Sequence, residues 1–103
     1  MKKLNGLTKP IEGLDGELII VGGTPEKPVH ETVGRMMSSV LARAQSDDPV
    51  KAMMIAMEIH GAESVDLEDA NFALVKEAVD KDQMLTNLGK AALLTVLNRT
   101  GDV

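Results

Sequence analysis

A twelve-residue segment with almost no polar side constrains this fold most strongly. Residues 49–60 read Pro-Val-Lys-Ala-Met-Met-Ile-Ala-Met-Glu-Ile-His, between Asp48 and Gly61. At about 100° per residue on a helical wheel, Lys51 and Glu58 fall within about 20° of each other, and apolar side chains occupy the rest. A helix that is apolar all round is buried, and one this short is buried in protein rather than in lipid. We therefore predict that this helix lies at the centre of the fold.

The composition limits the classes of partner. The chain has 103 residues, which is the size of one domain, and it contains one Phe, no Tyr, no Trp and seven Met. The core must be aliphatic, with flexible methionine filling the gaps. Aromatic rings on which single-stranded nucleic acid could stack are missing, and the net charge of −5 repels phosphate backbones. We expect no nucleic-acid partner.

Cysteine usage and hydropathy bear on chemistry and location. The absence of Cys excludes disulfides, thiolate zinc sites and Cys nucleophiles. The opening Met-Lys-Lys imitates a signal peptide, but polar residues interrupt any apolar run after it. No stretch approaches the roughly 20 apolar residues that a membrane-spanning helix needs. We expect a soluble cytoplasmic protein without a membrane partner.

The chain divides into two parts within a single domain, 1–103. Residues 1–28 hold five of the nine Gly and three of the four Pro, whereas helical periodicity dominates residues 29–103. The predicted fold class is α+β, mainly α: an N-terminal β-hairpin followed by a compact cluster of four short helices.

The predicted hairpin is centred on Asp15-Gly16. This dipeptide suits a type I′ turn between residues 7–14 and 17–21, and Leu18-Ile19-Ile20-Val21 is the best strand sequence in the chain. Residues 24–28, which contain two prolines, are predicted to form a stiff, extended connector.

Helical periodicity and end signals predict four helices. The first begins at about His30, Asp48 and Pro49 start the second, and Thr86 or Asn87 caps the fourth. A capping box at Asp66 and Asp69 starts the third, and Gly101 closes the fourth. The predicted ranges are residues 30–45, 49–60, 66–79 and 86–98.

A search for catalytic chemistry gives no candidate. His30 and His60 are the only imidazoles, at a predicted helix start and a predicted helix end, which is not the spacing of a metal pair. Ser38 and Ser39 fall on the polar side of a helix, outside any nucleophile context. The acids of residues 63–82 suit helix starts better than a calcium loop. We predict no catalytic, cofactor-binding or metal-binding residue, and no enzyme activity.

The methionines suggest a surface for association. Five of them lie on two consecutive predicted helices, either as ordinary core or as a surface that repacks around a partner. Four short helices cannot wrap helix 49–60 and also cover the wide apolar face of residues 88–97. We therefore expect a protein partner or a homo-oligomer. The candidate interaction surface comprises Met36, Met37, Met53, Met54, Met57, Phe72 and Leu94.

Several segments together resemble a small family encoded in the tail-gene region of phages and prophages. The matching segments are Asp15-Gly16, Val40-Leu41-Ala42-Arg43-Ala44, Asp48-Pro49-Val50-Lys51-Ala52, Ser64-Val65-Asp66-Leu67-Glu68-Asp69-Ala70, Leu74-Val75-Lys76-Glu77-Ala78-Val79 and the helix of residues 88–97. The resemblance implies a tail-assembly chaperone or a minor morphogenesis factor, and it brings no catalytic residues. The functional prediction is a non-enzymatic protein-interaction factor in tail assembly. The alternative is a small regulatory or apolar-ligand-binding module with a Met-lined interior.

Overall fold

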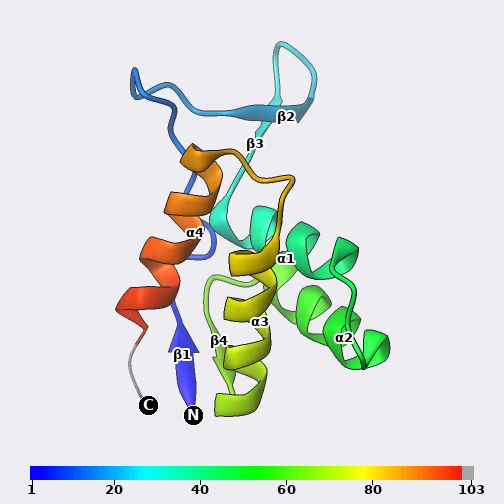
Figure 1. The fold of residues 1–103 in the computed structure, drawn as a ribbon. Coiled ribbons are helices and arrows are strands. Elements are labelled where there is room, and N and C mark those ends of the chain that lie inside the picture. The colour runs from blue at the N-terminus through cyan, green and yellow to red at the C-terminus, as the bar shows by residue number, and fades with distance from the viewer. Residues whose placement is uncertain (101–103) are drawn as a thin grey trace.

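The computed structural model describes residues 1–100. In that range the chain forms four α-helices and two small antiparallel sheets (Figure 1), so the predicted α+β, mainly α class is confirmed. The helices are α1 (Val33–Arg43), α2 (Pro49–His60), α3 (Asp69–Lys81) and α4 (Asn87–Arg99). The strands are β1 (Lys2–Leu4), β2 (Ile20–Gly23), β3 (Pro28–His30) and β4 (Val65–Leu67).

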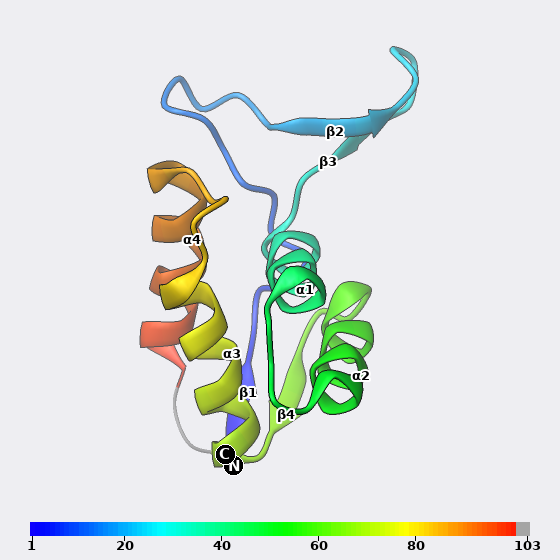
Figure 2. The same ribbon diagram turned by 45° about the vertical axis from the view of Figure 1, so that its right-hand side comes forward.

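Helix α1, not α2, is the central helix. It packs against α2 on one side and against α3 and α4 on the other (Figure 2). Its core side chains Met37, Val40 and Leu41 are at most 1% exposed. The prediction that α2 occupies the centre is wrong. A helical wheel shows which side chains are apolar, but the number of elements that reach a helix is decided by the path of the whole chain.

The first sheet pairs the two strands that are farthest apart in the sequence. β1 runs antiparallel to β4, with Lys3 opposite Asp66. Asp66 therefore lies in a strand and does not cap a helix. Helix α3 begins at Asp69, and its N-cap residue Glu68 makes no side-chain capping bond. The predicted capping box is wrong because the segment that contains Asp66 pairs with β1, which lies more than sixty residues earlier in the sequence, and so forms a strand.

The second sheet is a hairpin in an unexpected place. β2 pairs with β3, and Thr24 and Lys27 exchange backbone hydrogen bonds across the turn between them. Gly23 has φ +82°, and a Cβ there would lie 2.3 Å from the Lys27 carbonyl oxygen, so the turn requires glycine. Residues 24–28, which were predicted to form an extended connector, therefore contain the turn of the β2–β3 hairpin. His30 ends β3, so the predicted helix start is wrong as well; Thr32 is the N-cap of α1.

The chain also reverses at Asp15-Gly16, but with little strand structure. A single bridge joins Glu12 to Leu18, and residues 7–14 form no extended strand. Gly16 has φ +79°, whereas no residue other than glycine within residues 1–100 has a positive φ. A type I′ turn needs positive φ at both central residues, so the predicted turn type is wrong.

Instead of forming a strand, the N-terminal segment of residues 7–14 contributes two side chains to the hydrophobic core. Leu7 and Ile11 are 1% and 3% exposed, and the Leu7 carbonyl accepts a 2.7 Å hydrogen bond from the Gly34 backbone N–H. A Cβ on Gly34 would lie 2.9 Å from the Leu7 carbonyl oxygen and 3.0 Å from that of Ile59. The missing side chain lets α1 contact both α2 and the N-terminal segment closely.

The β2–β3 hairpin projects from the helical body as an arm (Figures 1 and 2), and all four residues of β2 are exposed. Two predicted helix starts are confirmed: the Asp48 side chain accepts from the Lys51 N–H, with Pro49 following it, and the Thr86 hydroxyl accepts from the Gly89 N–H. The predicted cap at Gly101 lies outside the described residues.

Candidate interaction surface

One side of α2 is apolar and faces solvent. The exposed fractions are 69% for Val50, 43% for Met53, 59% for Met54 and 72% for Met57. We call these four residues the α2 face. The opposite side is buried against α1 and consists of Ala52, Ile55, Ala56 and Ile59. The helix is therefore apolar on two sides, of which the protein covers one, and its predicted burial all round is wrong.

The α2 face has a defined order. Val50, Met54 and Met57 follow the i, i+4, i+7 spacing and form its middle row. Lys51 and Glu58 lie along one edge, and Met53 lies along the other, toward α1. There an open hollow of about 200 Å³ lies at the surface, between α1 and α2. Its lining is Ser38, Ser39, Ala42, Met53, Ala56, Met57 and His60.

The free energy available from covering this face is substantial. The four exposed fractions together equal about two and a half fully exposed large side chains. At roughly 1.5–3 kcal/mol for each such side chain, burial on a partner would contribute about 4–7 kcal/mol. Isolated exposed hydrophobic residues are common on soluble proteins, whereas contiguous patches often serve binding. Unbranched methionine also adapts to the shape of a partner.

The other two predicted methionines lie away from this face. Met37 is fully buried and belongs to the core, so it is not part of any surface in this structure. Met36 is partly buried against α4, where its Sδ would lie 2.9 Å from a Cβ on Gly89. The predicted Met-lined interior therefore contains one fully buried methionine among residues 1–100.

The last two predicted residues also lie elsewhere. Phe72 and Leu94 are partly buried against the core, and the Lys2 ammonium lies 6.0 Å from the centroid of the Phe72 ring. The structure adds Val50, which sequence reasoning missed as a surface residue. Its spacing of four and seven residues from Met54 and Met57 was the available signal.

Ser38 and His60 form a contact that the sequence did not suggest. Ser38 is 6% exposed, so its predicted surface position is wrong, and its Oγ lies 3.3 Å from Nδ1 of His60. The Ser38 hydroxyl donates to the Arg35 carbonyl oxygen at 2.9 Å. An activated serine donates its proton to the histidine instead. The contact therefore joins α1 to α2 and is not the geometry of a nucleophile and its base.

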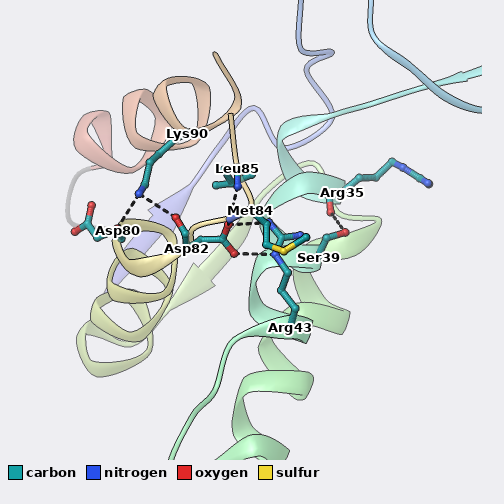
Figure 3. Close-up of polar contacts among 8 residues, drawn as sticks. All are labelled: Arg35, Ser39, Arg43, Asp80, Asp82, Met84, Leu85 and Lys90. Carbon is teal, nitrogen blue, oxygen red and sulfur yellow. Dashed lines mark hydrogen bonds and ion pairs between the residues drawn. The ribbon is translucent and has the colours of Figure 1, made fainter. Parts of the chain in front are cut away.

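The densest polar cluster joins α1 to the turn between α3 and α4 (Figure 3). The Asp82 carboxylate accepts from Arg43 Nε at 2.7 Å and Nη2 at 3.0 Å, and from the backbone N–H groups of Met84 and Leu85 at 2.8 Å. Lys90 Nζ donates to the Asp82 carbonyl oxygen at 3.1 Å. The Arg43 guanidinium lowers the pKa of Asp82 from 3.8 to about 2. Because these groups satisfy one another, the cluster has a structural role.

Within residues 1–100, no three His, Asp or Glu side chains gather as metal ligands. None of the helices in that range combines the length and hydropathy needed to cross a membrane. A second hollow, of about 340 Å³, lies between the N-terminal segment and α4, with Ile11, Leu88 and Val96 among its apolar lining and Lys9 and Arg99 among its charged lining.

Compared with protein-family models, curated proteins and solved structures, the chain shows no significant match. The α2 face is the largest group of exposed large apolar side chains on any one helix of the described chain.

Proposed function

We propose that this chain is a non-enzymatic protein-interaction factor that holds a partner protein on the α2 face. The proposed setting is phage or prophage tail assembly in the cytoplasm of a bacterial host. One observation carries the proposal: four large apolar side chains are exposed together on one side of a helix whose other side is already packed.

The composition of the face supports a partner over accidental exposure. A solvent-facing helix side normally carries charged and polar residues, because these cost nothing in water. Here the middle row is Val50, Met54 and Met57, with charges confined to one edge. The net charge of −5 supplies repulsion that limits nonspecific aggregation. The tail-assembly setting rests on the resemblance of the sequence segments given above.

Substitution of Met57 by lysine tests the proposed function. Met57→Lys places a charge in the middle of the α2 face, and Met84→Lys makes the same change at a methionine that is 77% exposed after α3. The chain would be co-expressed with the products of its neighbouring genes and purified, and retained proteins would be identified by mass spectrometry. We expect the wild type and Met84→Lys to retain the same tail-gene product, and Met57→Lys to lose it at least tenfold. Equal retention by both variants would refute the proposed function.

A second candidate function has one observation in its favour. The 340 Å³ hollow beside α4 falls within the size range of small-ligand pockets. Its lining combines apolar side chains with two cationic ones, Lys9 and Arg99, against one carboxylate, Glu12. A small amphipathic carboxylate fits this chemistry, although the lining contains no methionine. A thermal-shift screen of medium-chain fatty acids tests this function. Stabilisation that is lost in Arg99→Gln supports it, and the absence of any shift at millimolar ligand refutes it.

A further inference from the structure

The two charges beside the α2 face are placed unfavourably for their own helix. Lys51 lies in the first turn of α2 and Glu58 in its last turn, whereas the helix dipole favours the opposite arrangement. Within residues 1–100, none of the ion pairs involves either residue. Two unpaired charges of opposite sign thus lie on one edge of an exposed apolar face, seven residues apart.

We propose that a second copy of this chain covers the α2 face, with the two α2 helices packed antiparallel about a two-fold axis near Met54. This inference rests on the proposed function and names the partner of the same surface. An antiparallel contact places Lys51 of each copy opposite Glu58 of the other, so that symmetry forms the ion pair twice. Each charge then lies beside the end of the neighbouring helix that its dipole favours.

The apolar row suits the same arrangement. Along α2, the midpoint between Val50 and Met57 falls between residues 53 and 54. The midpoint between the two charged residues, Lys51 and Glu58, falls one residue farther along, between residues 54 and 55. One residue of helix corresponds to about 1.5 Å, so a single axis serves both sets. Val50 of one copy then meets Met57 of the other, and the two Met54 side chains meet near the axis. Flexible methionine side chains fill such a contact well.

The size of the face indicates a weak, reversible dimer. Helix α2 has twelve residues and is about 18 Å long, so the contact buries much less than the roughly 800 Å² per partner of a stable complex. We expect dissociation constants on the order of tens of micromolar. Because the face can be covered only once, a tail-protein partner displaces the second copy.

Charge substitutions measured by sedimentation equilibrium test the antiparallel contact. Lys51→Glu replaces both ion pairs with repulsion, and we expect the dimer to weaken about tenfold; Glu58→Lys should do the same. The double variant Lys51→Glu/Glu58→Lys restores the pairs and should return the dissociation constant to within threefold of the wild type. Single variants without effect, or a double variant that remains as weak as either single, would overturn the arrangement.

Cross-linking gives an independent readout because the chain has no cysteine. Met54→Cys places one thiol near the proposed axis, within the Cα separation of about 4.4–6.8 Å that a disulfide requires. Mild oxidation should convert this variant to a covalent dimer at least ten times faster than Met84→Cys, whose position is at least as exposed (77% against 59%) but lies outside α2, between α3 and α4. Equal rates for the two variants would overturn the proposal.

Failure of this inference is distinguishable from failure of the proposed function. Suppose that the wild type stays monomeric at millimolar concentration and that Met57→Lys still loses its tail-gene product. The proposed dimer is then refuted, whereas the proposed binding of a partner protein is still supported. Dimerisation that persists unchanged in Met57→Lys also overturns the proposal, because another surface then carries it. If Met57→Lys alters neither self-association nor partner retention, both are refuted.

Discussion

Replacement of Asp82 by asparagine tests how the core helices are held together. Asp82 follows α3, and its carboxylate joins the Arg43 side chain at the end of α1 to the backbone N–H groups of the next turn. The side chain of Asp82 is 6% exposed, and that of Arg43 is 35% exposed. Asp82→Asn retains one oxygen acceptor in nearly the same shape, but it removes the negative charge and so leaves Arg43 without its ion-pair partner.

The expected magnitude follows from the pKa of Asp82. A fall from 3.8 to about 2 corresponds to about 2 kcal/mol of stability when the carboxylate is ionised. Solvent reaches Arg43 and screens part of the attraction, so we expect Asp82→Asn to cost about 1–2 kcal/mol at pH 7. Because folding lowers this pKa, the contribution is complete above about pH 5 and is lost as the pH falls through 2.

Urea denaturation at a series of pH values measures this contribution. The difference in unfolding free energy between the wild type and Asp82→Asn should be about 1–2 kcal/mol at pH 7 and should fall to a small fraction of that value near pH 2. Glu77→Gln is the matched control, because it makes the same chemical change in an exposed ion pair with Lys81 on one helix. We expect no resolvable change from it. A pH-independent difference for Asp82→Asn, or an equal effect of the control, would refute the reasoning.

Three further predictions concern the packing of the helices. Gly34→Ala should destabilise the fold by about 1–3 kcal/mol despite the better helix propensity of alanine, because the new Cβ meets backbone carbonyls that cannot move independently. Gly89→Ala should be neutral or stabilising by up to about 1 kcal/mol, because the only close atoms its Cβ meets are at the flexible end of Met36, and the Thr86 hydroxyl lies at ordinary contact distance. Equal losses in the Gly34 and Gly89 variants would contradict this distinction. Leu93→Ala should cost about 2–5 kcal/mol, because Leu93 is fully buried, and a loss below 1 kcal/mol would contradict its place in the core. Urea denaturation at pH 7 measures all three.

Local signals in the sequence predicted the local structure well. The Asp48-Pro49 start of α2 and the Thr86 cap of α4 were correct, since a capping side chain bonds to a backbone group only two or three residues away. The number of helices and the α+β class followed from apolar periodicity in the same way. Such interactions span one turn of helix, so the sequence pattern contains all of their participants.

Predictions that required knowledge of a distant partner were wrong. Asp66 was predicted to cap a helix, but it pairs in a sheet with Lys3, which lies near the start of the sequence. Residues 24–28 were predicted to be a connector because their two prolines are evident in the sequence. The close approach of Gly23 to the Lys27 carbonyl oxygen, which belongs to the turn, is evident only in the structure.

The candidate interaction surface also combines a local feature that the sequence determined with a tertiary feature that it did not. The sequence by itself determined that residues 49–60 form a helix with apolar side chains on nearly every side, and that its two charges share one edge. Only the tertiary structure decided which apolar side is covered. The N-terminal segment, α3 and α4 pack around α1, whereas α2 packs mainly on α1, so its Val50 and Met57 remain in solvent. Burial depends on the arrangement of all the elements, and apolarity alone does not determine it.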